Sequence, residues 1–200
     1  MNFWMRSGYK GVAKTVKFIF IILDRIFEYW TILFARLLFY CSGMSALIHY
    51  VQKLRNPTPV LSNFGAQIGE GTLVYPGIIL HGAAKNYSNL KIGKNCRIGR
   101  NCLLDLTDKI EIDDRASIGL RNTLITHVNA AESPLGEEML PQSAPIFVET
   151  GVITYTNVTI LMGVRMGECS TASAGSVIFR KVQPWALVGG NPARFIKKLK

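Results

Sequence analysis

Charged residues are scarce in this sequence, and acidic residues are missing from its last segment. Only 18% of the 200 residues are charged, whereas 48% are hydrophobic. This composition excludes an intrinsically disordered chain, because enough apolar side chains are present to bury a core. Residues 180–200 contain six basic residues and no acidic one. The length fits one compact domain with an appendage.

The net charge of +10 is divided between the two ends of the chain. Residues 1–57 hold eight basic and two acidic residues, whereas residues 58–179 hold nine basic and eleven acidic ones. A uniformly basic protein of this charge would be a candidate for nucleic-acid binding. Here the near-neutral middle offers no basic stripe to follow a phosphate backbone, so we expect no nucleic-acid partner.

Cysteine and histidine spacings typical of disulfide frameworks and metal sites are missing as well. The four cysteines are Cys41, Cys96, Cys102 and Cys169, and the three histidines are His49, His81 and His127. No two of these cysteines are separated by only two residues, and the histidines are far apart in the sequence. A chain of this length does not need disulfides to fold. We therefore expect neither a disulfide framework nor a zinc site.

A long apolar segment near the N-terminus lacks the uninterrupted run of about 20 apolar residues that is typical of a transmembrane helix. Residues 12–41 are almost continuously apolar, but charged residues interrupt every window. These residues are Lys14, Lys17, Asp24, Arg25, Glu28 and Arg36. On a helical wheel they fall within roughly one third of the circumference. The pattern predicts an amphipathic helix with an unusually wide apolar side.

Three arrangements of this helix remain open. It could lie in a membrane interface with its basic stripe toward the lipid headgroups. It could instead pack on protein, or form a tilted or re-entrant span. Because no small-residue cleavage site follows, a secretory signal is not expected. We expect a membrane-associated segment over residues 1–57, peripheral on the cytoplasmic face, which Asn56-Pro57-Thr58-Pro59 separates from the next domain.

The rest of the sequence repeats every six residues. Aliphatic or small residues recur at Val148, Thr154, Ile160, Met166, Ala172 and Ile178. Upstream the pairs Ile68/Val74, Ile92/Ile98 and Ile112/Ile118 show the same period, with a two-residue slip near Asp108-Lys109. Four residues after most of these stands a small or β-branched residue.

A six-residue period fits neither an ordinary strand nor a helix, but it fits a triangular coil with three short strands. Coils of about 18 residues would stack at the spacing of about 4.8 Å between parallel strands. The aliphatic residue would point inward, and Cys96 and Cys102 would be small inward-facing corner residues. Glycine often follows the aliphatic position, as in Ile92-Gly93, and would relieve the backbone at the corner.

Three segments in this register resemble the hexapeptide-repeat acyltransferases. They are Asn157–Val164, Ala174–Ile178 and the C-terminal run Gly189-Gly190-Asn191-Pro192-Ala193-Arg194. The resemblance implies an all-β fold, a left-handed parallel β-helix of about five to six coils. It would occupy residues 58–185, with an extruded loop at 128–145 and a basic C-terminal segment at 186–200. The sugar and polysaccharide O-acetyltransferases, such as the maltose, galactoside and nodulation-factor enzymes, are the most similar branch.

His127 is the candidate general base that this resemblance implies. It ends a repeat just before the non-repeating stretch, where the family places its catalytic histidine. Acyl transfer from a thioester to a hydroxyl needs such a base near the acceptor oxygen. Glu132, Glu137 or Glu138 of the loop could orient the imidazole. His81 also precedes a break in the repeat, but no motif supports it, so we expect a structural or surface role.

The resemblance also implies the remaining site residues. Those expected to bind coenzyme A are Thr156, Gly163, Ala174, Arg180, Arg194 and Lys197. Asn101 and Asp105 are the candidates for binding the acceptor. Tyr155 and Phe179 replace residues that are usually glycine and threonine in the family, and they lie close to the expected groove.

Together these features predict an acetyl-CoA-dependent O-acetyltransferase that acts on a sugar hydroxyl of a polysaccharide or lipid-linked saccharide, as a homotrimer at the membrane. An N-acetyltransferase of an amino-sugar nucleotide is the alternative, since the same base and groove serve amines. A noncatalytic membrane-anchored scaffold is a third possibility. A metal-dependent γ-class carbonic anhydrase shares the fold, but its His-x4-His spacing does not occur here.

Overall fold

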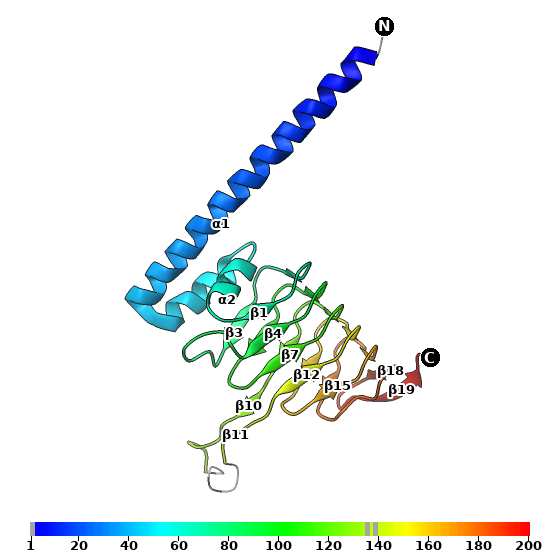
Figure 1. Cartoon of the computed structure of the whole chain (residues 1–200). Coiled ribbons are helices and arrows are strands. Elements are labelled where there is room, and N and C mark those ends of the chain that lie inside the picture. The colour runs from blue at the N-terminus through cyan, green and yellow to red at the C-terminus, as the bar shows by residue number, and fades with distance from the viewer. Residues whose placement is uncertain (1–2, 135–136, 138–139) are drawn as a thin grey trace.

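The six-residue period forms a three-sided solenoid of parallel strands, as predicted. The computed structural model describes residues 3–134, 137 and 140–200. Consecutive strands belong to three different sheets, so each coil visits all three in turn (Figure 1). The first and third sheets contain five strands and the second contains seven. These numbers confirm the predicted five to six coils.

Most strands are two or three residues long. The first sheet contains β1 (Gln67–Ile68), β4 (Leu90–Ile92), β7 (Ile110–Ile112), β12 (Ile146–Val148) and β15 (Arg165–Met166). The second contains β2 (Leu73–Val74), β5 (Arg97–Ile98), β8 (Ser117–Ile118), β13 (Ile153–Thr154), β16 (Thr171–Ala172), β18 (Ala186–Gly189) and β19 (Arg194–Lys198). The third contains β3 (Ile79–His81), β6 (Leu103–Asp105), β9 (Thr123–Leu124), β14 (Thr159–Ile160) and β17 (Val177–Ile178).

The core is a set of columns in which equivalent residues of successive coils lie above one another. In the first sheet Ile92 pairs with Ile112, which pairs with Val148. In the third sheet Leu104 pairs with Leu124. All five of these side chains are buried. The stacking therefore explains why one aliphatic position repeats along the sequence.

The glycines after the aliphatic positions serve close stacking rather than a special backbone conformation. A Cβ atom on Gly69 would lie 2.6 Å from the carbonyl carbon of Gly93, and one on Gly93 would lie 2.6 Å from the Asp114 nitrogen. The backbone of the next coil thus leaves no room for a side chain. Positive φ angles occur elsewhere at the corners, for example at Asn95 and Asn101. The expected role of these glycines in relieving the corner backbone is therefore wrong.

Cys96 and Cys102 are inward-facing residues of the solenoid, as predicted. Both side chains are fully buried. The Cys96 thiol donates to the Asp113 carbonyl at 3.0 Å, and the Cys102 thiol donates to the Gly119 carbonyl at 3.1 Å. Burial raises the pKa of both thiols. A protonated, buried thiol is a poor nucleophile, so both cysteines are structural.

The N-terminal helix α1 (Phe3–Lys53) is bent at Gly43, whose φ of 70° and ψ of −165° are not helical. The part after Gly43 packs on the first coil through Leu47 and Val51, which are fully buried. A second helix, α2 (Thr58–Asn63), covers the same end of the solenoid. The β-helix therefore starts at Gln67 rather than at residue 58, because α2 caps the end of its core.

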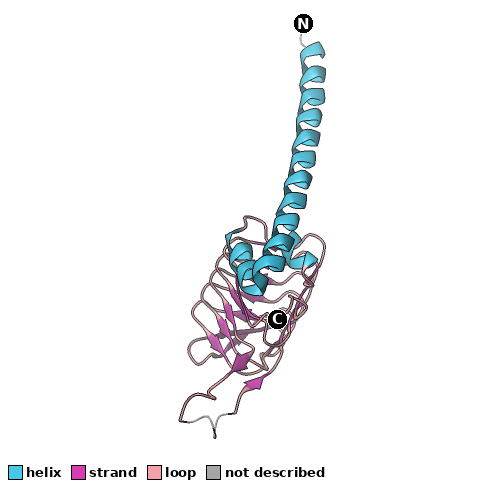
Figure 2. Ribbon diagram, turned by 90° about the vertical axis from the view of Figure 1, so that its left-hand side faces the viewer, coloured by secondary structure: helices cyan, strands magenta, loops and turns pink. Residues whose placement is uncertain are grey.

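The first part of α1, up to Trp30, projects away from the solenoid (Figure 2), whereas Ala35 is fully buried and Arg36 Nε donates to Asn63 Oδ1 of α2 at 3.1 Å. Its side chains between Phe18 and Trp30 are largely exposed, apolar ones included. Over Phe18–Lys53 the helix is long and apolar enough to cross a membrane, and 11% of its most apolar window is buried. Apolar side chains without protein cover require another apolar surface.

The C-terminal segment belongs to the solenoid, contrary to the expected boundary at residue 186. β18 pairs in parallel with β16, and β19 turns back antiparallel on β18. Ala186 and Val188 are buried and continue the columns of the core. The basic residues of this segment are therefore held on a β-ribbon.

Two insertions interrupt the coils at one corner, between the third sheet and the first. Residues 82–89 separate β3 from β4 in the first coil. In the third coil the chain leaves the prism as a hairpin of β10 (His127–Val128) and β11 (Gln142–Ser143), which pair antiparallel. This hairpin projects from the side of the solenoid (Figure 1). The corner with both insertions contains the candidate site.

Candidate functional site

Three successive coils place polar residues at this corner. His81 ends β3 and Asp105 ends β6, and the two are aligned in the strand register. His127 follows β9 in the next coil and begins β10. The columnar stacking therefore places residues more than 20 positions apart next to one another.

Asp105 holds the His127 imidazole. The His127 Nδ1 atom lies 2.5 Å from Asp105 Oδ2, and the His127 backbone N–H donates to the same oxygen at 3.1 Å. The side chain of Asp105 is 2% exposed, and that of His127 is 27% exposed. Because an ionised carboxylate can only accept, Nδ1 carries the proton. The Nε2 atom of His127 is thereby left with a free lone pair, as a general base requires.

Other donors surround the Asp105 carboxylate. Thr107 donates to Oδ1 from its backbone at 3.1 Å and from its hydroxyl at 2.7 Å. Thr126 donates to Oδ2 from its backbone at 2.9 Å and from its hydroxyl at 3.0 Å. Burial raises the pKa of the carboxyl, but the hydrogen bonds from His127, Thr107 and Thr126 outweigh it and hold the pKa well below its usual range. Asp105 is therefore ionised at neutral pH.

This geometry makes Asp105 a positioning residue for His127 rather than a residue that binds the acceptor. Its buried oxygens already face protein donors, so the expected acceptor contact is wrong for this side chain. The loop glutamates do not orient His127 in the part of the chain that is described. Glu132 and Glu137 are exposed and make no hydrogen bond to it, and Glu138 lies outside the described residues.

His81 is a site residue that the sequence reasoning missed. Its Nδ1 atom lies 3.3 Å from Asp105 Oδ1. Its ring is stacked on that of His127 with an interplanar angle of 2° and a centroid distance of 5.4 Å. The expected surface position agrees with its exposed side chain, but the contact with Asp105 beside His127 was not predicted. The signal that could have found this contact is the spacing of 24 residues that Leu80–Leu104 and His81–Asp105 share. Residues one coil apart lie side by side.

The potential metal-ligating atoms of His81, Asp105 and His127 lie within 4.8 Å of one another. A metal ion here would have to displace the threonine and backbone donors that surround the Asp105 carboxylate. It would also have to replace the Nδ1 proton of His127. The residues around Asp105 therefore fit a carboxylate that is hydrogen-bonded to two imidazoles better than they fit a metal site.

Asn101 is the other residue that was expected to bind the acceptor. It lies at the opposite corner of the third sheet, where the strands begin. It precedes β6, whereas Asp105 ends β6 beside His127. Four residues of extended chain separate these edges by about 13 Å. Within one chain Asn101 is therefore not beside His127, and this prediction is wrong for a single protomer.

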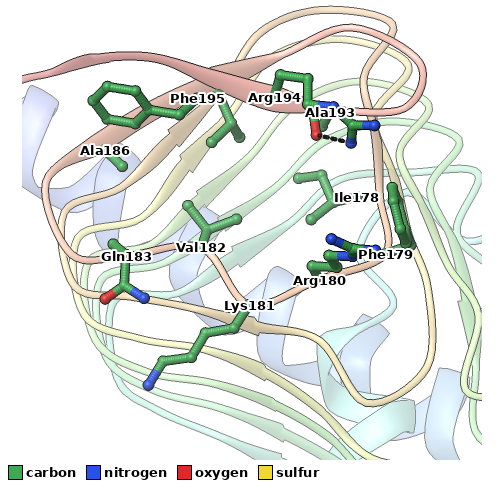
Figure 3. Close-up of a pocket in the computed structure, with 11 residues that line it drawn as sticks. Ile178, Phe179, Arg180, Lys181, Val182, Gln183, Ala186, Ala193, Arg194 and Phe195 are labelled. Atoms are coloured by element: carbon green, nitrogen blue, oxygen red, sulfur yellow. Dashed lines mark hydrogen bonds between the residues drawn. The ribbon is translucent and has the colours of Figure 1, made fainter.

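Two of the residues expected to bind coenzyme A share one pocket. Arg180 and Arg194 line a pocket of about 270 Å³ near the C-terminus, between the end of β17 and β19. Figure 3 shows both side chains on the same side of this pocket as Phe179, with Lys181 pointing away. The guanidinium carbons of Arg180 and Arg194 lie 5.1 Å and 6.0 Å from the centre of the Phe179 ring. This pair forms a concentrated positive charge.

The other expected coenzyme A residues occupy separate positions. Thr156 and Ala174 lie at one corner of neighbouring coils, where the Gly175 N–H donates to the Thr156 carbonyl at 3.0 Å. Gly163 lies at the corner with the insertions, close to Ala144. Lys197 is exposed on β19 and does not line the arginine pocket. The six residues therefore lie at two different corners of the solenoid and on its C-terminal ribbon, not in one pocket.

Comparison with known proteins agrees with the fold. No family model matches the chain. A segment of 73 residues is 37% identical to a 2,3,4,5-tetrahydropyridine-2,6-dicarboxylate N-acetyltransferase of Brevibacillus brevis. This match covers 36% of the chain and 31% of that protein. The chain thus matches less than a third of the length of this curated relative.

Solved structures cover more of the chain. A hexapeptide-repeat acetyltransferase from Vibrio cholerae, also solved with acetyl-CoA, has a TM-score of 0.69 at 26% identity, over 80% of this chain and 90% of its own. A galactoside acetyltransferase in complex with coenzyme A has a TM-score of 0.63 at 22% identity, over 86% and 82%. A maltose O-acetyltransferase from Clostridium difficile 630 has 0.62 at 23%, over 72% and 75%. The β-solenoid of this chain is therefore the fold of the hexapeptide-repeat acetyltransferases.

Proposed function

We propose that the chain is an acetyl-CoA-dependent O-acetyltransferase that acts on a sugar hydroxyl of a polysaccharide or lipid-linked saccharide. The observation that carries the proposal is the His127–Asp105 pair, with Nδ1 held by a buried carboxylate and Nε2 free. The shared fold supports it, because related structures have been solved with acetyl-CoA or coenzyme A.

The geometry supports one sequence of steps. His127 Nε2 removes the proton of the acceptor hydroxyl, and the alkoxide oxygen attacks the thioester carbonyl carbon. Backbone N–H groups would stabilise the oxyanion. The carbon–sulfur bond then breaks, and the proton on His127 passes to the leaving thiolate. Ionised Asp105 stabilises the imidazolium that exists between the two proton transfers.

Coenzyme A would contact the corner that holds Thr156 and Ala174 and the neighbouring corner that holds Gly163, with its phosphates toward the basic C-terminal ribbon. Arg180 and Arg194 would form charge-assisted hydrogen bonds to them, which are roughly twice as strong as neutral ones. Lys197 on β19 would add positive charge nearby. The positive charge at the C-terminal end supports this assignment.

N-acetylation of an amino-sugar nucleotide is the second candidate. One observation favours it: the curated relative with the 37% identical segment is an N-acetyltransferase. The His127–Asp105 pair could accept a proton from an amine as well as from a hydroxyl. A noncatalytic scaffold is disfavoured, because it would not require a buried carboxylate to orient a half-exposed imidazole.

An acceptor panel distinguishes these candidates. The purified full chain would be incubated with acetyl-CoA and neutral saccharides, lipid-linked saccharides or amino-sugar nucleotides. We expect thiol release with a saccharide, and an ester product that mass spectrometry detects and mild base removes. A base-stable amide formed only with amino sugars would establish the second candidate. Thiol release that no acceptor stimulates would refute both.

We also propose that α1 attaches the protein to the cytoplasmic face of a membrane. The exposed apolar side chains between Phe18 and Tyr40 and the basic residues near both ends of the helix support this. Deleting residues 1–26 removes the exposed apolar run Phe18–Leu23 and keeps the part of α1, from Thr31 onward, that packs on α2 and the solenoid. We expect the full chain to sediment with anionic vesicles and the truncated chain to stay in the supernatant. Equal sedimentation of the two would contradict the anchor.

A homotrimer is the proposed assembly. Exposed apolar side chains follow the second sheet, a pattern that favours a protein interface. They are Leu73, Tyr75, Leu120, Ile153 and Tyr155. We expect sedimentation equilibrium of the truncated chain to give three times the protomer mass. Replacing Tyr155 by Glu should shift the mass toward the monomer, whereas a monomeric parent chain would refute the proposal.

A further inference from the structure

His81 is unusual for an exposed histidine because its ring orientation is fixed. The side chain is 63% exposed, so nothing in its burial restrains it. Nevertheless its Nδ1 atom faces Asp105 Oδ1 at 3.3 Å, and its ring is parallel to that of His127. An exposed side chain normally keeps several rotamers, and ordering it has an entropic cost.

The shared carboxylate gives both imidazoles the same tautomer. Ionised Asp105 accepts from the Nδ1 atoms of both His81 and His127, one on each oxygen. Each Nε2 atom therefore carries a lone pair, and each lies on the far side of its ring from the carboxylate. Since the ring planes differ by only 2°, two hydrogen-bond acceptors stand side by side at the corner.

A hollow begins immediately beyond His81. It has a volume of about 230 Å³ and lies between the 82–89 insertion and the segment Leu106–Thr107. Asn89 is held there by the bond from its Nδ2 atom to the Leu106 carbonyl at 2.9 Å. Asn86 accepts from the Ser88 N–H at 3.0 Å, which orients its amide group. The hollow is smaller than pockets that enclose drug-sized ligands, and its polar side chains suit a single sugar ring.

We propose that His81 is a specificity-determining residue that accepts a hydrogen bond from a second hydroxyl of the acceptor. His127 removes the proton of the hydroxyl that reacts, while His81 Nε2 holds its neighbour, so that the pair selects a polyol and the position of transfer. The hollow is lined by neither histidine but begins at Gly82, the residue after His81, so a part of the acceptor next to the reacting ring would extend to Asn86 and Asn89. This inference rests on the proposed O-acetyl transfer and names the acceptor class as a saccharide with neighbouring free hydroxyls.

The test compares a polyol with a mono-alcohol. The probes are methyl α-D-glucopyranoside and cyclohexanol, and the variants are His81→Phe, which keeps the stacked ring, and His81→Gln, which keeps a hydrogen-bond acceptor. For His81→Phe we expect KM for the glucoside to rise at least tenfold and the products to spread over several hydroxyls. Transfer to cyclohexanol should fall much less than transfer to the glucoside, and His81→Gln should restore part of the selectivity.

Two results would overturn the inference. An equal loss of transfer to both probes would mean that His81 acts only by positioning Asp105. Loss of wild-type activity on chelation, restored by zinc, would mean that the cluster binds a metal.

A binding measurement separates this inference from the proposed function. In the full chain labelled with ¹⁵N-histidine, the glucoside should shift the Nε2 signals of both His81 and His127, whereas cyclohexanol should not shift that of His81. An unmoved His81 signal would refute the inference even if transfer occurs. A shifted signal without transfer to either probe would uphold it and refute O-acetylation.

Discussion

Replacing His127 by Ala should lower kcat for acetyl transfer by ~10²–10⁴-fold, the usual contribution of a general base. The alcohol proton would then have no acceptor at the corner, because the Asp105 carboxylate is buried and faces other donors. KM for acetyl-CoA should change little, since the arginine pocket is lined by other parts of the chain. Initial rates of thiol release at saturating acceptor measure the effect.

His49→Ala is the matched control for this substitution. His49 is exposed on α1, where its Nδ1 atom contacts the Ser45 carbonyl of the same helix. It should keep full activity. Both variants should keep the thermal unfolding temperature within a few degrees, because neither removes a buried apolar side chain. A fully active His127→Ala enzyme would refute the mechanism.

Replacing Asp105 by Asn should be nearly as damaging to kcat, with a loss of about 10²–10⁴-fold. The amide keeps the shape of the carboxylate but removes its charge, so the imidazolium loses its stabilising partner. The amide oxygen would take the place of Oδ2, where Thr126 and His127 direct their backbone N–H groups, so the NH₂ group would face the Thr107 donors at the place of Oδ1. A neutral amide oxygen is also a weaker acceptor than a carboxylate for the Nδ1 proton of His127.

The same substitution should destabilise the fold by about 1–3 kcal/mol at pH 7, because buried donors lose their acceptor. The pKa of Asp105 is lower in the folded chain than its usual value. Its contribution to stability is therefore fully present above about pH 4, the unfolded value, and is lost as the pH falls through the lower folded value. The difference in unfolding free energy between wild type and Asp105→Asn should be constant from pH 5 to 8 and shrink below pH 4.

Denaturant unfolding at several pH values measures this difference. Asp113→Asn is the matched control, because Asp113 is an exposed aspartate that follows β7 in the next coil, at another corner of the solenoid. It should change neither kcat nor stability. A constant difference between wild type and Asp105→Asn down to pH 3 would show that folding does not lower the pKa of Asp105.

The solenoid could be predicted because its rule is local. Each coil buries one aliphatic residue per face, so columns such as Ile92–Ile112–Val148 appear in the sequence as a period. The position of His127 at the end of a coil could also be predicted, since the repeat stops directly after it, whereas its proposed role as the base came from the family resemblance. The partners of His127 depend instead on the register between coils, and insertions make the spacing irregular.

Irregular coil lengths explain why His81 was missed. Regular coils are 18 residues long, as between Val148 and Met166, whereas the 82–89 insertion lengthens the first coil to 24, from Leu80 to Leu104. The coil is thus one six-residue unit longer than a regular coil, so a count of 18 residues from His81 falls on Gly99, and only a count of 24 arrives at Asp105. The position of Asn101 was predicted wrongly for a related reason. Although Asn101 is close to Asp105 in sequence, the two residues lie at opposite ends of the segment that forms β6.

The corner that holds His81, Asp105 and His127 lies close to the end of the solenoid that α1 and α2 cap. His81, Asp105 and His127 belong to the first three coils, and β3 itself contacts α1. At about 4.8 Å per coil, the base lies only ~10–15 Å from the end of the prism that the helices cap. If α1 holds that end against the lipid, a membrane-anchored acceptor needs no long glycan to arrive at His127, and sugars close to the headgroups are the ones presented for transfer.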